Sequence, residues 1–378
     1  MRDFKLALKG SVGPRENDSR NLLDPHRRGV PGRATMRTDR DQDAVDLVIV
    51  GCGAGGATLA QRLARRGWRI VVIEAGPFWD PDRDWVSDEA GSHPLFWTQN
   101  RIVGGEDPVE MGKNNSGRGV GGSMVHYAGY APRFHPSDFE TLTRDGVGAD
   151  WPIAYADLHD HYEDLELELP VAGQHWPWGV AHGYPHGPHP VGGAAERAWQ
   201  GARACGIEMR VGPVAITNGT FGNRPHCIYR GFCLQGCKVG AKASPLVTHV
   251  PEALKHGVEV RARAMVTRIE TDASGACTGV AYRHGGRERA GTVAVAAYSI
   301  ESPRLLLSSG IGNHFDQVGR VVDADHRVWG VPNLFVCDGS VMPTQGAANP
   351  ALTIMALASR LAQRLAAGRI VPARAAVA

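Results

Sequence analysis

The feature that most constrains this chain is a glycine-rich turn between a predicted buried strand and a predicted helix. Gly51, Gly53 and Gly56 form the pattern G-x-G-x-x-G, and the apolar run at residues 46–50 directly precedes it. In such a turn the first glycine permits a tight bend and the second lets the backbone approach a pyrophosphate. The third lets the helix pack closely on the strand. The pattern therefore predicts a site for a phosphate-bearing ligand at the N-terminus of a helix.

The residues after the turn complete a β-α-β unit. Helically spaced leucines occupy residues 57–66, and a second strand at 68–74 ends in Glu74. An acid at that point accepts hydrogen bonds from ribose hydroxyls in dinucleotide-binding proteins. A glycine turn without a ligand is the alternative, and the two strands, the helix and the acid together disfavour it. The unit does not distinguish FAD from NAD.

The remainder of the chain predicts a mixed α/β organisation with long irregular stretches. Residues 77–112 are rich in Trp, Pro and Asp and are expected to form loops. Apolar periodicity predicts strands at 258–269, 279–283, 292–297 and 333–337, and helices at 154–169, 194–205, 302–309 and 349–366.

Charge and hydropathy exclude two classes of partner. Lys and Arg number 41 and Asp and Glu 39, so the net charge is only +2 and nothing favours nucleic acid. No apolar run approaches the roughly 20 residues that cross a bilayer, so no transmembrane segment is expected. Residues 1–43 are polar and predict a disordered N-terminal extension, in which the pair Arg27-Arg28 lacks the apolar stretch of an export signal. We expect a cytoplasmic protein, with the periplasm, reached through a partner subunit, as the alternative.

Several further segments carry a resemblance to a known family. Residues 117–126 read GRGVGGSMVH, and residues 333–340 read NLFVCDGS and continue through Pro343 to NPALTI at 349–354. WPI at 151–153 and ESPRLLL at 301–307 fit the same order. Together these segments resemble the flavin signatures of the glucose-methanol-choline (GMC) oxidoreductases. The resemblance implies FAD as the cofactor, and an NAD-dependent reductase becomes the weaker reading.

The resemblance also implies roles for particular residues. Gly121, Gly122 and Ser123 correspond to the flavin loop, and Val266 to the residue whose backbone meets the adenine. Asp338 and Gly339 correspond to the segment that binds the ribityl or phosphate region. Asn349 and Pro350 open a helix whose amides can stabilise negative charge on the reduced flavin ring. A turn residue at Asp338 and a helix cap at Asn349 are the alternatives.

His126 stands where some family members carry a histidine bonded covalently to the flavin. The alternative is a histidine that lines the flavin pocket without such a bond.

Three cysteines, Cys227, Cys233 and Cys237, form a second motif in a turn-rich segment. Their spacing resembles that of bacterial FAD-dependent glucose dehydrogenases, which implies an iron-sulfur cluster that relays electrons to a partner protein or quinone. Zinc bound with His226, or plain buried thiols, are the alternatives. Lys238 replaces the proline of the iron-sulfur members. The histidines at 175, 182, 186 and 189 lack metal spacing and predict a solvated loop.

The sequence departs from the family after residue 320. A long substrate-binding region is expected there, but the chain passes directly to VVDADHR at 321–327. The resemblance implies that the catalytic histidine belongs to that region and acts together with a histidine or asparagine near the C-terminus, here Asn349, which is thus the catalytic residue that remains. Asn349 alone has no basic nitrogen to accept an alcohol proton. His314 and His326 flank the junction without matching the catalytic position. We therefore expect FAD binding to survive and alcohol oxidation to be severely impaired.

The sequence thus predicts an α/β protein with an FAD/NAD(P)-binding Rossmann-like domain of GMC type and a reduced substrate or cap domain. The function implied is FAD-dependent oxidation of the CH-OH group of a small-molecule sugar or alcohol, with electrons passed to an acceptor other than oxygen. A non-catalytic flavin-binding remnant is the alternative. The predicted segments are the extension at 1–43, FAD-binding parts at 44–145, 251–320 and 321–370, and a partial cap with the cysteines at 146–250.

Overall fold

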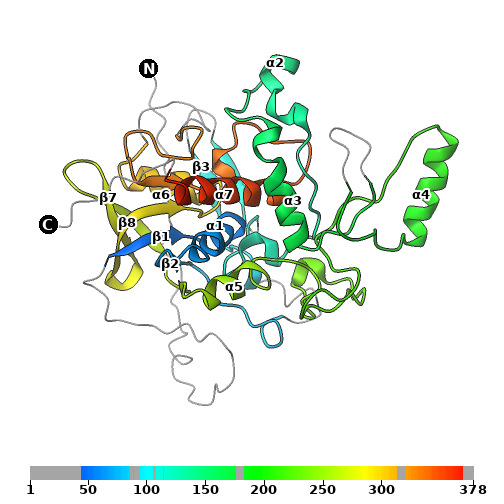
Figure 1. Cartoon of the computed structure of the whole chain (residues 1–378), viewed down its shortest axis with the longest axis horizontal. Helices are drawn as coiled ribbons and strands as arrows, with labels where there is room; N and C mark the ends of the chain where they lie inside the picture. Colours follow the sequence, from blue (N-terminus) through cyan, green and yellow to red (C-terminus); the bar gives the residue numbers. More distant parts are fainter. Residues whose placement is uncertain are drawn as a thin grey trace.

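A computed structural model of the chain describes residues 44–85, 88, 94–104, 108–113, 115–175, 183–312 and 321–368. These residues form an α/β fold in which helices cover a central sheet (Figure 1). The predicted N-terminal extension at 1–43 lies outside the described residues.

A parallel sheet forms the centre of the fold, in the order β5-β2-β1-β8-β9. Its strands are β1 (Val45–Val50), β2 (Ile70–Ile73), β5 (Glu259–Arg261), β8 (Gly286–Val295) and β9 (Leu334–Val336). Parallel strands buried on both faces are apolar throughout, and β1 and β2 show this pattern. The sheet therefore joins the first strand of the described chain, β1, to the last, β9.

Strand β8 belongs to two pairings at once. Its last residues lie between β1 and β9, with Val295 opposite both Val50 and Val336. Its first residues pair antiparallel with β7 (Cys277–Tyr282), which in turn pairs with β6 (Val266–Thr271). The predicted meander is thus present, but it is an extension of the central sheet.

The two faces of β1 build two separate cores. Leu47 and Ile49 pack in a cluster with residues of α1 (Ala54–Ala64), α5 (His249–Lys255) and α7 (Ala351–Ala366). Val48 and Val50 pack in a second cluster with β6, β7 and α6 (Glu301–Ser308). Figure 1 shows α1 at the centre of the molecule, with α7 and α5 on either side of it. The period-2 alternation of β1 therefore supports helices on one face and a helix plus the meander on the other.

A third core lies between α7 and the segment that contains α3 (His159–Glu168). Tyr162 is fully buried there, and its hydroxyl lies 2.8 Å from Thr353 Oγ1 of α7. In contrast, α4 (Gly193–Ala204) has no buried residue and extends away from the body at the right of Figure 1. The other helices are α2 (Thr141–Asp145) and the short 3₁₀ turns at Gly122–Val125, Pro136–Phe139, Tyr155–Asp157, Cys233–Gln235, Arg283–Gly285 and Gly339–Val341.

Two expectations about secondary structure were wrong. The stretch 77–112 contains a hairpin, β3 (Arg101–Val103) and β4 (Val109–Gly112), because apolar Ile102 and Val103 can pair with Glu110 and Val109. Residues 258–269 form two strands, because Arg263 adopts a left-handed conformation with φ +58° and turns the chain between β5 and β6. Helix α5 was not predicted from the sequence.

Among the described residues, the hairpin β3-β4 is the second sheet, and it has two strands. Apart from the central sheet and this hairpin, the described residues form no sheet that could be the core of a full substrate domain. Segment 146–250 contributes no strand to the central sheet, whereas all three predicted FAD-binding segments do. The division into domains stays a prediction.

Candidate flavin site

A cavity of about 540 Å³ opens at the carboxyl ends of β1, β2 and β8. Ligands of open α/β sheets bind at this edge of the sheet. The cavity wall brings together residues from four distant segments of the chain. Of the residues predicted to bind the cofactor, it contains Gly51, Gly53, Glu74, Gly122, Ser123, Val266, Asp338, Gly339, Asn349 and Pro350.

The three glycines of the fingerprint lie in three different environments. Gly51 has φ +99°, and a Cβ there would lie 2.3 Å from Ala296 O on the neighbouring strand end. Gly56 does not line the cavity, and a Cβ on it would lie 2.0 Å from Gly51 O. Gly53 lines the cavity and is the N-cap of α1. The turn is therefore shaped by Gly51 and Gly56, and Gly53 presents backbone to the cavity.

Glu74 is held at the end of β2 by two backbone amides. Its carboxylate accepts from Cys52 N at 2.9 Å and from Gly76 N at 2.8 Å, and the residue is buried. A carboxylate has about four acceptor positions, so two remain for hydroxyl donors in the cavity. This geometry suits the predicted contact with a ribose.

The second glycine loop lies directly against the fingerprint. A Cβ on Gly122 would lie 2.6 Å from Gly53 Cα, so the two backbones touch on the cavity wall. Ser123 faces the cavity, and its Oγ accepts from Gly117 N at 2.9 Å. Gly121 does not line the cavity, and a Cβ on it would point at Val125 and Leu246. The loop contributes through Gly122 and Ser123, and Gly121 permits its turn with φ +100°.

Two helix N-termini point at the cavity without side-chain caps. Helix α1 begins after Gly53 and α7 after Pro350, and neither has a capping hydrogen bond from a side chain. The first four amides of a helix have no partner within the helix, so they are available to a ligand. Backbone donors and the positive end of a helix dipole favour anionic groups. This donor set fits the phosphates and the electron-rich flavin edge of FAD.

Asp338 is bound to the protein through both carboxylate oxygens. Its Oδ1 accepts from Ser340 N at 2.9 Å and from Ser340 Oγ at 2.6 Å, and its Oδ2 accepts from Tyr298 N at 3.1 Å and from Ser302 Oγ. Burial raises the pKa of Asp338, while the hydrogen bonds from Ser302 and Ser340 lower it. The turn role foreseen as an alternative is therefore present, and the carboxylate lies on the cavity wall at the same time.

His126 lies behind the cavity wall. A Cβ on Gly117, which lines the cavity, would lie 2.9 Å from His126 Nε2, and that nitrogen is buried without a partner among the described residues. Burial and the charge of Lys242 lower the pKa of His126 to about 4, so the imidazole is neutral at physiological pH. Its ring packs on Phe96 at 4.4 Å between centroids.

No histidine lines the cavity in the part of the chain that the structure describes. Asn349 is exposed and lines the cavity two residues before α7 begins. The N-cap of α7 is Pro350, so the alternative of Asn349 as a helix cap was wrong. His326 is buried, its Nδ1 lies 3.1 Å from Val336 O on β9, and burial lowers its pKa to about 4. It is a structural residue. His314 lies outside the described residues.

The three cysteines of the second motif line a separate apolar cavity of about 350 Å³. All three thiols are free and partly buried. Their three sulfur atoms do not all lie within 4.8 Å of one another, whereas thiolate ligands of one tetrahedral zinc ion are about 3.8 Å apart. Trp85 also lines this cavity, and its buried Nε1 has no partner among the described residues. The cysteines therefore surround a space larger than a single ion.

Lys242 connects the two cavities. It is 2% exposed, and its Nζ donates to Cys233 O at 2.6 Å, to Tyr127 O at 2.8 Å and to Val125 O at 2.9 Å. Tyr127 lines the first cavity and Cys233 the second. No sequence pattern predicts a role for Lys242, because a lysine gives no local signal of burial.

The histidine-rich stretch is only partly a solvated loop. His189 lines the second cavity, with one ring nitrogen 3.0 Å from Tyr229 OH and the other 3.0 Å from Ile216 O. His182 lies outside the described residues.

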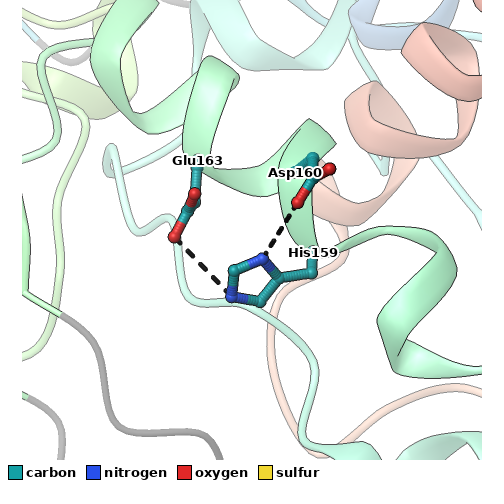
Figure 2. Close-up of side chains that lie close together, drawn as sticks. All are labelled: His159, Asp160 and Glu163. Atoms are coloured by element: carbon teal, nitrogen blue, oxygen red, sulfur yellow. Dashed lines mark hydrogen bonds and ion pairs between the residues drawn. The ribbon is translucent and has the colours of Figure 1, made fainter.

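Figure 2 shows a different group, in which the His159 ring lies between Asp160 and Glu163 at the start of α3. The distances are 3.3 Å to Asp160 Oδ1 and 3.6 Å to Glu163 Oε1, and both acids are exposed. Solvated acids are common at a helix start, so we assign this group no function.

The fold and cavity define a protein of the FAD-binding Rossmann-like α/β class. Family models for GMC oxidoreductase match residues 114–327 and 311–358, and a model for lycopene cyclase protein matches residues 46–98. The chain belongs to the GMC oxidoreductase family.

Known proteins agree with this assignment. The chain is 30% identical to paromamine 6'-oxidase of Streptomyces fradiae, over 83% of this chain and 60% of that protein. It is 33% identical to 6'''-hydroxyparomomycin C oxidase of Streptomyces lividus, over 82% and 59%, and 28% identical to the fructose dehydrogenase large subunit of Gluconobacter japonicus, over 73% and 58%. The chain thus spans about 60% of the length of these relatives.

The solved structure of pyridoxine 4-oxidase from Mesorbium loti superposes with a TM-score of 0.60 at 15% identity, over 85% of this chain and 99% of that chain. This likeness concerns the fold alone. Among the described residues, no helix is both long and apolar enough to span a bilayer.

Proposed function

We propose that this chain binds FAD and acts as a GMC-type oxidoreductase on the CH-OH group of a sugar or alcohol. The observation that carries the proposal is the single cavity wall that joins Gly53, Glu74, Gly122 and Asn349. We assign the cofactor to the segments 44–145, 251–320 and 321–370, with 146–250 as a partial cap.

The residues present fit such a cofactor in order along the cavity. Glu74 would hold the ribose, the turn at Gly53 and the start of α1 the pyrophosphate, and Ala264, Met265 and Val266 would lie against the adenine. The uncapped start of α7 at Pro350 would face the flavin. Bound FAD supplies the two-electron acceptor for the hydride of an alcohol.

Oxidation of an alcohol releases the hydroxyl proton as well as a hydride. Removal of hydride from a CH-OH group also requires a base for the hydroxyl proton. Asn349 can position a hydroxyl by hydrogen bonds but has no basic nitrogen. No histidine lines the cavity among the described residues. The second candidate function is therefore FAD binding without oxidation of an alcohol.

One set of spectra tests both candidates. The purified protein, supplied with FAD and freed of excess, is expected to show the absorption bands of bound flavin. Anaerobic addition of sugars and alcohols is then followed at those bands, with dithionite as the control for reducible flavin. Bleaching by an alcohol supports the enzyme, bleaching by dithionite alone supports the second candidate, and a colourless protein would refute both.

We also propose that the second cavity holds an iron-sulfur cluster on Cys227, Cys233 and Cys237. Its size, its three free thiols and the unpartnered Trp85 N–H support a bound group with acceptor atoms. Such a cluster would pass electrons from the flavin to a protein or quinone acceptor. Iron and sulfide analysis of the anaerobically purified parent chain and of Cys233→Ser tests this, and loss of iron is expected in the variant. Cys205→Ser is the matched control, because Cys205 is exposed and lies outside the cavity.

A further inference from the structure

Three donor groups gather on the wall of the first cavity outside the glycine fingerprint. They are the indole of Trp97 and the guanidinium groups of Arg101 and Arg118, and all three residues line the cavity. The Arg101 guanidinium lies 4.4 Å from the centre of the Trp97 ring, and that of Arg118 lies 5.6 Å from it. One indole therefore holds two cations close together, and of the two only Arg101 has an ion pair with a described residue, Glu301. The charge of Arg118 is left for an anion in the cavity.

The Trp97 N–H lacks a partner in the described part of the chain. Trp97 is 9% exposed, and its Nε1 is buried without a hydrogen bond. A buried N–H without an acceptor destabilises a folded protein, because it has lost its hydrogen bond to water and gained none. An unpartnered donor on a cavity wall therefore points to a ligand that carries acceptor oxygens.

Arg101 is fixed on one edge and open on the other. It is 4% exposed, its Nε donates to Glu301 Oε1 at 2.9 Å, and its Nη1 donates to Asn115 Oδ1 and Ser116 Oγ, both at 2.8 Å. Its Nη2 makes no hydrogen bond to the described residues. Because the side chain is otherwise enclosed, the free edge of the guanidinium is available on the cavity side.

Arg118 is exposed and forms neither a hydrogen bond nor an ion pair through its side chain with the described residues. Its backbone is fixed in a particular place, because a Cβ on Gly76 would lie 2.5 Å from Arg118 C. Gly76 N is a donor to Glu74, and the other end of the same loop touches Gly53 through Gly122. Arg118 thus stands between the acid predicted for the ribose and the turn predicted for the phosphates.

We propose that Arg118 and Arg101, with the Trp97 N–H, bind the pyrophosphate of the adenine dinucleotide together with the N-terminus of α1. The inference rests on the proposed FAD binding. Guanidinium forks pair with phosphate oxygens better than point charges do. Glu301 acts as a positioning residue, since it fixes Arg101 and also accepts from Arg304 Nε at 2.6 Å.

The test compares binding of three probes that differ in phosphate. FAD and ADP-ribose both carry the pyrophosphate, and riboflavin carries none. Dissociation constants are measured by calorimetry at low and high salt for the parent chain, Arg118→Gln, Arg101→Gln and Arg144→Gln. Arg144 is exposed on α2, away from the cavity, and matches the lost charge.

We expect Arg118→Gln to weaken FAD and ADP-ribose by similar factors of about 10-fold or more, as for a charged hydrogen bond. Riboflavin binding and the Arg144→Gln variant should be unchanged, and the salt dependence of FAD binding should fall in Arg118→Gln. Arg101→Gln should act in the same direction. It can also destabilise the fold by leaving Glu301 buried and less well paired, so the exposed Arg118 decides the question.

Equal affinity of the parent chain and Arg118→Gln for FAD and ADP-ribose would overturn this inference and leave FAD binding itself standing. Equal weakening of riboflavin would also overturn it, because the effect would then not concern phosphate. Failure of the parent chain to bind FAD would instead remove the proposed function, and this inference with it.

Discussion

Replacement of the buried Lys242 is expected to destabilise the fold, by an amount that follows from its three hydrogen bonds and its pKa. Its ammonium donates to three buried carbonyl oxygens, of Val125, Tyr127 and Cys233, at 2.6–2.9 Å. Replacement by methionine keeps the length of the side chain and leaves three carbonyls without this partner, at roughly 1–3 kcal/mol each. Burial lowers the pKa of Lys242 from 10.5 to about 8, so the charged form costs about 3 kcal/mol, which the substitution relieves. The net loss expected at pH 7 is about 3 kcal/mol.

The pH dependence of this difference has a definite sign. Between pH 8 and 10.5 the unfolded chain binds a proton at Lys242 that the folded chain has released, so this group stabilises the fold as pH rises. From pH 7 to 9.5 the linkage amounts to about 2 kcal/mol. The stability gap between the parent chain and Lys242→Met should therefore widen from about 3 to about 5 kcal/mol. Buried tyrosines and cysteines also titrate in this range, but they are present in both chains.

Urea unfolding of the apoprotein at pH 7.0 and 9.5, followed by tryptophan fluorescence, measures the gap. Lys255→Met is the control, because the Lys255 side chain is 73% exposed, and its loss should change stability by less than about 0.5 kcal/mol. A stability difference below 1 kcal/mol at pH 7, or one that narrows as the pH rises, would refute the view that Lys242 stabilises the fold by its hydrogen bonds between the two cavities.

Three other predictions follow from single contacts. Gly55→Ala should prevent folding or lower the free energy of unfolding by more than about 4 kcal/mol, because its Cβ would lie 1.7 Å from Cys337 O. Thermal melting measures this. The control is Gly192→Ala, which should be tolerated because nothing lies within 4 Å of a Cβ at that exposed position. His326→Asn should remove up to about 3 kcal/mol of acid sensitivity between pH 6.5 and 4, measured by urea unfolding, because the folded pKa of about 4 lies below the unfolded value and stability is lost as pH falls. Denaturation in acid should release the flavin from reconstituted protein into the supernatant, because Gly117 separates His126 from the cavity; flavin retained on the chain in a His126-dependent manner would contradict this.

Local sequence patterns were sufficient for the nucleotide-binding unit. Strand β1 alternates between two cores, and Gly51 and Gly56 occupy positions where a side chain would meet backbone. These constraints act over a few residues, so period and glycine spacing reveal them. The family signatures added Gly122, Asp338 and Asn349, which the structure brings to the same cavity.

The tertiary structure decided the features that depend on residues far apart in the chain. It divides β8 between a parallel and an antiparallel pairing, buries Lys242 between two cavities, and places Arg101 against Glu301, 200 residues away. It also leaves the first cavity without a histidine among the described residues. A charged or polar side chain has no periodic signal for such a position, because its burial depends on the acceptors that packing brings to it. The chain's residues thus specified a dinucleotide fold locally, and only packing showed which charges surround the ligand.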